Sequence, residues 1–313
     1  MRNWPEVEDL SKIAIIGSIN MDIVNRVQEF PQPGETIHGS GTSYQPGGKG
    51  ANQAVAAALA GSGAIMVGAV GEDAFGSVLI ESLRSRGVDA TSVSVKEGSS
   101  GLAFITVSGS GENTIILSAG SNGKLTPADV MDDALAGASI ALLQNEVPPE
   151  VNLHALKRCA ELGVSACYNP APAAKIPEEA LPLVDTLVVN ETEAQVVSGL
   201  AVDGVDAAER AARALQAAGV RRVIVTLGAQ GALALDRDGA ALRVPAFKVA
   251  PADTTAAGDT FIGAYAAAIA AGRPLADALR YASAAAAISV TRHGAQSSIP
   301  SKEEIDRFLQ ERE

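Results

Sequence analysis

Short apolar runs alternate with alanine-rich stretches of helical spacing along most of this chain of 313 residues. The apolar runs fall at residues 13–16, 65–70, 140–143, 164–168, 187–189 and 223–227, and the helical stretches at 51–60, 75–86, 151–162 and 207–218. A strand that is apolar throughout is buried on both faces, which is typical of a parallel sheet with helices on both sides. The sequence therefore predicts an α/β fold, in which a mostly parallel central sheet is flanked by helices on both faces.

Two segments break this alternation. Residues 19–44 contain several prolines and glycines and show no helical period, and residues 101–118 form two β-rich runs around a turn at 109–112. We predict that both segments contribute to a small β-sheet that projects from the main domain. In this division, residues 1–17, 48–98 and 122–313 form the main α/β domain. Residues 18–47 and 99–121 form the projecting β-sheet (β-lid), which is expected to act as a lid, a dimer surface or both.

The charge of the chain argues against several classes of partner. It has 24 Lys and Arg against 36 Asp and Glu, a net charge of −12, and no run of basic residues, so we expect no binding to nucleic acid. Residues 1–11 contain no apolar signal core, and no apolar stretch is long enough to cross a membrane. We expect a cytoplasmic protein that has no membrane partner.

Polar residues collect where four of the predicted strands end. Asn20 and Asp22 follow the first strand, Glu146 follows the run at 140–143, and two further segments, 190–193 and 228–231, follow the last two. Ligands of open α/β sheets bind beyond the carboxyl ends of the strands, so a ligand site is predicted at this edge. Any one such segment by itself is equally typical of a surface loop.

The glycine-rich segment 47–53, with the sequence GGKGANQ, precedes a predicted helix. Adjacent glycines let the backbone approach a ligand closely and leave N–H groups free to donate. The segment is not a P-loop, because Gly50 stands where Ser or Thr would bind magnesium. It is not a dinucleotide-binding fingerprint either, because Gln53 occupies the position of the third glycine. From the residue types alone, a flexible loop before a helix remains the alternative.

The segment 253–261, with the sequence DTTAAGDTF, is the strongest signal in the chain. Small residues at the start of a helix expose unpaired N–H groups at the positive end of the helix dipole, which is a natural anion hole. Asp259 lies at that start. Residue chemistry leaves two roles for its carboxylate open, stabilisation of the helix dipole or general base catalysis beside a phosphate.

At these two segments the chain resembles the ribokinase-like carbohydrate kinases, or PfkB family, and the resemblance extends over residues 13–309. Residues 47–53 resemble the N-terminal signature of the family and residues 253–261 the C-terminal one. Four further segments resemble the members of the family that act on D-ribose, namely 17–22, 169–172, 190–193 and 292–296. The resemblance implies an enzyme that transfers the γ-phosphate of ATP to the 5-hydroxyl of D-ribose.

The resemblance also implies a role for each matching residue. Asp259 would be the general base, next to an anion hole formed by Gly258, Ala257 and Ala256. The sugar would be bound by Asn20, Met21, Asp22, Gly48, Lys49, Gly50, Ala51, Asn52, Glu146 and Asp259. The nucleotide would be bound by Asn190, Thr226, Leu227, Gly228, Ala229, Gln230, Gly231, Gly258, Asp259 and Ser283.

Two cations are implied as cofactors beside ATP. Asn190 and Glu193 would help to place Mg²⁺, largely through water. K⁺ would be bound, mostly by backbone oxygens, by Asp253, Thr255, Ser289, Arg292, Gly294 and Ser298. The chain departs from the family at Ser283, where relatives often have a larger Asn or His against the nucleotide. It also departs at Ser297, which replaces a common proline.

Other functions remain open at this point. The same chemistry could act on deoxyribose, another sugar or a nucleoside, and Asp22 is the residue that should discriminate, because a carboxylate there suits two adjacent hydroxyl groups. A different class of function is a catalytically silent regulator that binds a sugar or a nucleotide. The resemblance further implies a homodimer formed through the β-lid.

Overall fold

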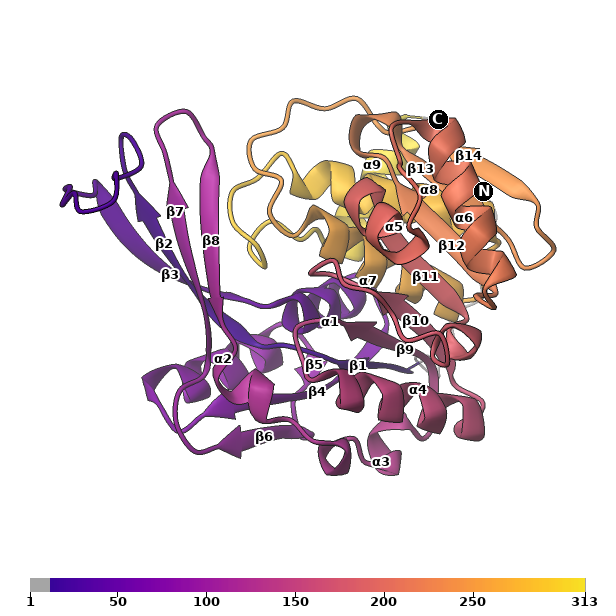
Figure 1. The fold of residues 1–313 in the computed structure, drawn as a ribbon, viewed down its shortest axis with the longest axis horizontal. Helices are drawn as coiled ribbons and strands as arrows, with labels where there is room; N and C mark the ends of the chain where they lie inside the picture. Colours follow the sequence, from indigo (N-terminus) through magenta and orange to yellow (C-terminus); the bar gives the residue numbers. More distant parts are fainter. Residues whose placement is uncertain (1–11, 313) are drawn as a thin grey trace.

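The computed structural model describes residues 12–312. Residues 1–11, on which the expectation of a missing signal core rests, lie outside the described part. Two sheets are present in it (Figure 1). The central sheet contains β1 (Lys12–Ile16), β4 (Gly63–Gly71), β5 (Val88–Asp89), β6 (Val93–Lys96), β9 (Ala138–Gln144), β10 (Ser165–Asn169), β11 (Thr186–Asn190), β12 (Arg222–Thr226), β13 (Ala232–Leu235) and β14 (Ala241–Val244). The second sheet contains β2 (Asn20–Arg26), β3 (Gly41–Gly47), β7 (Gly101–Val107) and β8 (Asn113–Ser118).

The central sheet is mostly parallel, as the sequence predicts. Its strand order is β14-β13-β12-β11-β10-β9-β1-β4-β5, and β6 pairs with β4. All pairings are parallel except those of β13 and β14 at one edge, which are antiparallel. Each of the six predicted strands overlaps an observed one, with boundaries that differ by only a few residues. Parallel pairing brings the carboxyl ends of β1, β9, β11 and β12 to the same edge.

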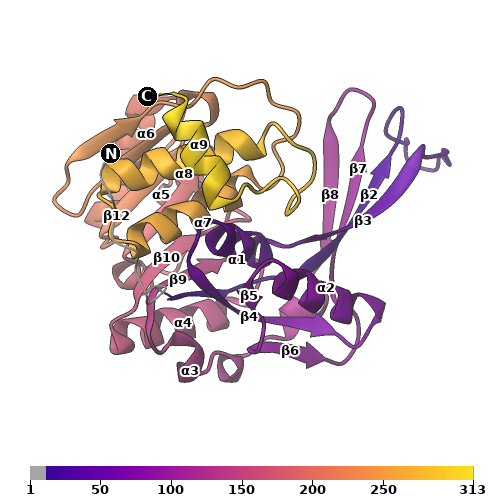
Figure 2. The same cartoon turned by 180° about the vertical axis from the view of Figure 1, so that it is seen from behind.

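Helices cover both faces of this sheet. They are α1 (Lys49–Leu59), α2 (Ala74–Ser85), α3 (Asp132–Leu135), α4 (Pro149–Leu162), α5 (Glu191–Ser198), α6 (Val205–Ala217), α7 (Ala257–Ala270), α8 (Leu275–Ser289) and α9 (Lys302–Gln310). In Figure 1, α3 to α6 lie in front of the sheet, and the reverse view in Figure 2 shows α1, α2, α7, α8 and α9 on the other side. Two separate hydrophobic cores, one on each face, confirm the predicted layers.

The second sheet projects from the body of the molecule (Figure 1). Its strand order is β3-β2-β7-β8. Strand β2 pairs in parallel with β7, which lies about 80 residues later in the chain, and the pairing begins with Asn20 opposite Gly101. These strands come from within the segments 18–47 and 99–121, and the division of the chain into a main domain and a lid stays a prediction. In the part of the chain that the structure describes, no helix is long and apolar enough to span a membrane.

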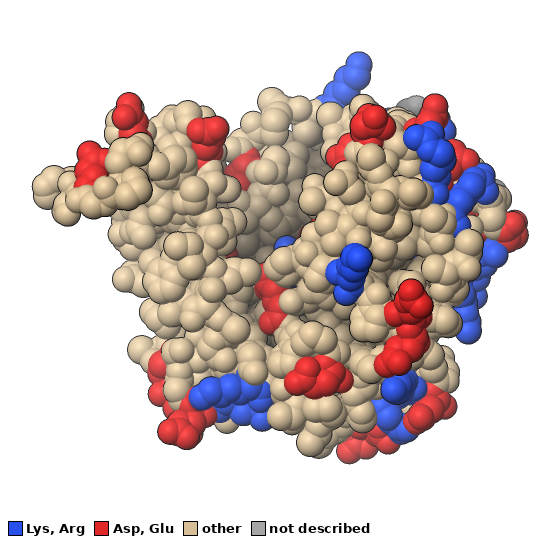
Figure 3. Space-filling view, in the orientation of Figure 1, with Lys and Arg blue, Asp and Glu red and all other residues tan. Residues whose placement is uncertain are grey.

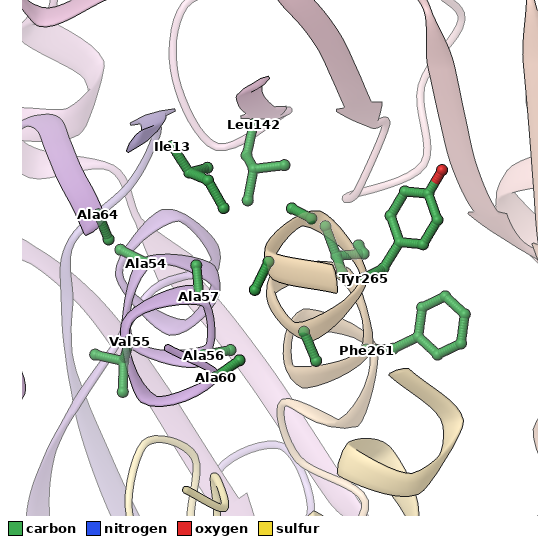
Figure 4. Packing of buried hydrophobic residues seen from close by; sticks show 14 of the residues in the cluster. Ile13, Ala54, Val55, Ala56, Ala57, Ala60, Ala64, Leu142, Phe261 and Tyr265 are labelled. Atoms are coloured by element: carbon green, nitrogen blue, oxygen red, sulfur yellow. The ribbon is translucent and has the colours of Figure 1, made fainter. Parts of the chain in front are cut away.

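Helices α1 and α7 pack against each other unusually closely. Figure 4 shows them side by side, with alanines such as Ala57 between them. Gly263 of α7 permits this approach, because a Cβ at that position would lie 2.5 Å from Ala56 Cβ and 2.6 Å from the carbonyl oxygen of Gln53. The small residues that the composition provides thus let the N-termini of two helices meet at the carboxyl edge of the sheet.

Candidate functional site

Asp259 lies in the first turn of α7, in the wall of a small cavity. The residue before this helix, Ala256, has φ of 59° and is the one residue other than glycine with positive φ among residues 12–312. This left-handed conformation costs an L-residue about 1–2 kcal/mol. It turns the chain into the helix so that the N–H groups of Ala257 and Gly258 come at the helix start without a partner within the helix. The Ala257 N–H donates instead to the carbonyl oxygen of Thr254 before the helix, at 3.3 Å. A Cβ on Gly258 would meet no atom within 4 Å, so the space in front of this turn is open.

Two amide side chains of α1 hold the Asp259 carboxylate. Asn52 Nδ2 donates to Asp259 Oδ2 and Gln53 Nε2 to Asp259 Oδ1, both at 3.0 Å, across about 200 residues of sequence. Asp259 is only 7% exposed, so these donors take the place of water around its charge. Asn52 was predicted as a site residue. Gln53 was not, although it stands in the same signature, because the glycine-rich segment indicates contact with a ligand and gives no sign of a contact with α7.

Glu146, which follows β9, is hydrogen-bonded to the start of α1. Its Oε2 accepts a hydrogen bond from the backbone N–H of Lys49 at 3.2 Å and another from the Ser18 hydroxyl. Gly48 and Gly50 permit the start of α1 to lie against residues 17–20. A Cβ on Gly48 would lie 2.7 Å from the backbone nitrogen of Asn20, and Gly48 has φ of 91°.

The predicted sugar-binding residues include two buried carboxyl groups, Asp22 and Asp259, the half-buried Glu146 and one lysine. Burial, the charge of Glu146 and the charge of Asp259 raise the pKa of Asp22 from 3.8 to about 7, and the positive charge of Lys49 opposes this shift. Burial alone would lower the pKa of Lys49, but the surrounding carboxylates, Asp259 first, outweigh it and raise that pKa. The lysine therefore stays charged and partly balances the acidic groups.

Asn20 lies at the start of β2 and accepts a hydrogen bond from Asn122 Nδ2 at 2.7 Å. Asn122 also bonds the backbone of Ile19 on both its N–H and its carbonyl. It was not predicted, since it lies in a short 3₁₀ turn with no distinctive motif. Met21 and Ala51 were predicted as sugar contacts, but their side chains are buried in the hydrophobic core, so only their backbone atoms remain for a ligand.

A cavity of about 580 Å³ lies on the other side of the start of α7. Its walls are largely apolar, with Phe247 and Val249 among them, as suits a flat heterocyclic base. Eight of the predicted nucleotide residues line this cavity or the one next to it, namely Asn190, Thr226, Gly228, Ala229, Gly231, Gly258, Asp259 and Ser283. Leu227 is buried in the core and Gln230 lines neither cavity.

A smaller cavity of about 220 Å³ connects the two halves of the site. It is bordered by Lys49, Glu193 and the turn 256–259, and it shares Thr226 and Gly258 with the larger cavity. Together the two cavities form a continuous path from an apolar chamber to Asp259.

The predicted magnesium residues form a capping box at the start of α5. Glu193 accepts hydrogen bonds from the backbone N–H and the side-chain amide of Asn190, each at 3.0 Å, and from Asn169. Burial raises the pKa of Glu193, and these hydrogen bonds and Lys49 oppose that rise. Because the Glu193 oxygens are already engaged, this pair fits a cation held through water better than one held directly. Within residues 12–312 no group of three or more His, Cys, Asp or Glu side chains could form a metal site on its own.

Hydrogen bonds hold the predicted potassium residues in two adjoining loops. The Asp253 carboxylate accepts from the backbone N–H groups of Thr255 and Gly294, each at 2.9 Å. The side chain of Arg292 pairs instead with Glu304 at 2.6 Å, so only its backbone carbonyl is left for a cation. Two further predicted members, Ser289 and Ser298, are fully buried. The oxygens that remain are mainly carbonyls, which suit K⁺.

A cleft of about 860 Å³ separates the projecting sheet from the main body, and Figure 3 shows it as a hollow with charged side chains at its floor. It is lined by Asp22 and Gln45 from the sheet, and by Asp253, Thr255 and Gly294 from the potassium loops. Asp22, a predicted sugar-binding residue, and the loops predicted to bind K⁺ therefore line the same cleft.

Known proteins resemble this chain in sequence and in fold. The model of the pfkB family of carbohydrate kinases matches residues 10–302. The chain is 42% identical to a ribokinase of Schizosaccharomyces pombe, over 94% of this chain and 96% of the relative, and 38% identical to a deoxyribokinase of Salmonella typhi, over 95% and 98%. The fold is similar to that of an Arabidopsis thaliana ribokinase solved with ribose and ATP, with a TM-score of 0.90, 31% identity and coverage of 96% and 99%. The chain belongs to the pfkB family of carbohydrate kinases.

Proposed function

We propose that the protein has ribokinase activity and transfers the γ-phosphate of ATP to the 5-hydroxyl of D-ribose. The observation that carries the proposal is the position of the Asp259 carboxylate, beside the open N-terminal turn of α7 and in the wall of a cavity that also includes Lys49. A sugar hydroxyl that approached from the lid cleft would meet the carboxylate and the anion hole together. Curated ribokinases with up to 42% identity support the choice of sugar.

Asp259 is the general base in this proposal. It accepts the proton of the 5-hydroxyl while the oxygen forms a bond to the γ-phosphorus and the bond from that phosphorus to the oxygen of ADP breaks. The N–H groups at the start of α7 stabilise the charge on the transferring group. The unpaired, buried Oδ1 of Asn52 is available to a sugar hydroxyl, since it has no partner among the described residues.

Two cations complete the proposed site. Mg²⁺, held through water near Asn190 and Glu193, would neutralise the charge of the ATP phosphates. K⁺ in the loops around Asp253 would act on the geometry of the anion hole without contact with substrate. Omission of either ion from the assay tests these assignments.

The substitution Asp259→Asn tests the base assignment. We expect turnover to fall by roughly 10²–10⁴, which is the usual contribution of a general base, while ribose binding persists. The matched control is Asp277→Asn, because Asp277 lies in the first turn of α8 and is exposed. A role in the helix dipole alone would make the two substitutions alike, and near-normal turnover of the Asp259 variant would refute the assignment.

Deoxyribose is the second candidate acceptor, because the Salmonella typhi relative is a deoxyribokinase. The discriminating assay measures release of ADP with ribose, 2-deoxyribose, fructose and adenosine, with and without potassium. We expect the highest kcat/KM with ribose and stimulation by potassium. A preference for deoxyribose would keep the mechanism and overturn the assignment of Asp22 as the acceptor of two adjacent hydroxyls.

We also propose that two copies pair through the lid. Strand β8 exposes Ile115, Ile116 and Leu117, with Ile116 70% exposed, and Phe104 lies on the neighbouring strand. A patch of this kind is typical of an interface. Light scattering should give twice the mass of the chain, and Ile116→Lys should halve it.

Since the enzyme consumes ATP, we place it in the cytoplasm, and fluorescence microscopy of a tagged form tests this.

A further inference from the structure

Two buried side-chain amides form a chain of hydrogen bonds that leads from Asp259 away from the cavities. Gln53 Nε2 donates to Asp259 Oδ1 at 3.0 Å, and Gln144 Nε2 donates to Gln53 Oε1 at 2.7 Å. Gln53 and Gln144 are fully buried, and neither lines any of the cavities described above. Unlike Asn52, which is 6% exposed, they have no direct route to a substrate. Their effect on the reaction must pass through Asp259.

Gln144 and Asp259 together fix which end of the Gln53 amide faces the carboxylate. The oxygen and nitrogen ends of an amide have nearly the same shape and opposite polarity. Because the Gln144 nitrogen donates to the Gln53 oxygen, the Gln53 nitrogen has to point at Asp259. The reversed amide would place two N–H groups against each other, and an oxygen against the Asp259 charge.

A hydrogen bond holds the backbone of Gln144, and its side chain packs against Gly17. Its backbone oxygen accepts a hydrogen bond from Asn152 Nδ2 at 2.7 Å. Its Oε1 lies against Gly17, where a Cβ would overlap with it, and has no partner among the described residues. A buried carbonyl without a partner opposes folding, and an apolar side chain of the same size would avoid that penalty. Unlike such an apolar side chain, Gln144 donates an N–H hydrogen bond to Gln53.

We propose that Gln53 and Gln144 are positioning residues that orient the Asp259 carboxylate for proton abstraction, and that Gln144 acts through Gln53, whose amide is held at its other end by Asp259 itself. The inference rests on the proposed function, in which Asp259 is the base. Two donors, from Asn52 and Gln53, each occupy one oxygen of Asp259. The carboxylate therefore cannot rotate without breaking one of them, and its remaining lone pairs stay directed toward the cavity. Orientation of a reacting group within a fraction of an ångström is a large factor in rate.

Isosteric substitutions test the relay. Gln53→Met removes the donor to Asp259, and we expect kcat to fall roughly 10- to 100-fold, as for loss of a hydrogen bond to a charged group. Gln144→Met should lower kcat less, by roughly 3- to 10-fold, because Gln53 then loses only its orientation. In both variants the KM for ribose and the affinity for ATP should change less than about threefold. A purely structural role would instead change stability and both affinities.

The double variant gives the decisive measurement. If Gln144 acts through Gln53, the combination of Gln53→Met and Gln144→Met should be no slower than Gln53→Met alone. Losses in kcat that multiply would overturn the relay.

Asp259→Asn separates this inference from the proposed function. Near-normal turnover of that variant means that Asp259 is not the base, and the relay then fails with it. If Asp259→Asn is slow and Gln53→Met retains wild-type kcat, the base assignment stands and only the relay is wrong. In the Asp259→Asn background, Gln53→Met should cause no further loss of kcat.

Discussion

The raised pKa of Asp22 predicts how stability depends on pH. Burial first, then the charges of Glu146 and Asp259, shift this pKa from 3.8 to about 7, and Asp22 is 8% exposed. At 1.36 kcal/mol for each tenfold change in proton affinity, the shift corresponds to about 4 kcal/mol. Between these two pKa values the folded state holds a proton that the unfolded state has released. The free energy of unfolding therefore falls as pH rises through this window and levels off above it.

The substitution Asp22→Asn removes this penalty. The free energy of unfolding of the variant, relative to wild type, should increase by about 3 kcal/mol between pH 5 and pH 8, since most of the folded-state titration takes place in that range. Urea denaturation at pH 5, 6, 7 and 8, followed by circular dichroism, measures the difference. The control is Asp89→Asn, because the hydroxyl and the backbone N–H of Thr91 lower the pKa of exposed Asp89. Its difference from wild type should not change over this range. A difference that stays constant for Asp22→Asn as well would refute the reasoning.

Three further substitutions test the geometry of the site. Gly263→Ala places a methyl group 2.5 Å from Ala56 Cβ; overpacking of this kind costs about 1–3 kcal/mol, and we expect lower stability in urea and lower kcat as α7 shifts. Gly47→Ala places a Cβ against the Asp22 carboxylate, so calorimetry should show at least a tenfold loss of ribose affinity with ATP affinity unchanged. Ala256→Gly relieves the positive φ of 59° and should stabilise the fold by about 1 kcal/mol in thermal unfolding, and a loss of stability would contradict the strain.

The local pattern of the sequence determined the layers of the fold. Apolar runs predicted the strands that are buried on both faces, such as β1 and β9, because burial on two sides requires apolar residues at every position. Helical spacing predicted α1, α2, α4 and α6 to within a few residues. Short strands such as β13, with the sequence ALAL, were not predicted, since their register is set by pairing with β12 and not by a periodicity of their own. The parallel pairing of β2 with β7 joins segments about 80 residues apart. The sequence of neither segment predicts this pairing.

The sequence predicted the two signature segments, which contain Asp259 and Asn52. This was possible because helix starts and glycine-rich turns have characteristic local sequences. Only the tertiary structure decided how these residues act on one another. It brings α1 within hydrogen-bonding distance of α7 across about 200 residues, and it adds Gln144 from a third element. It also buries Asp22 beside Glu146, which shifts its pKa. The physical reason is that hydrogen bonds and Coulomb interactions depend on distance in space, and spatial proximity between distant segments arises only when the sheet and its helices have packed.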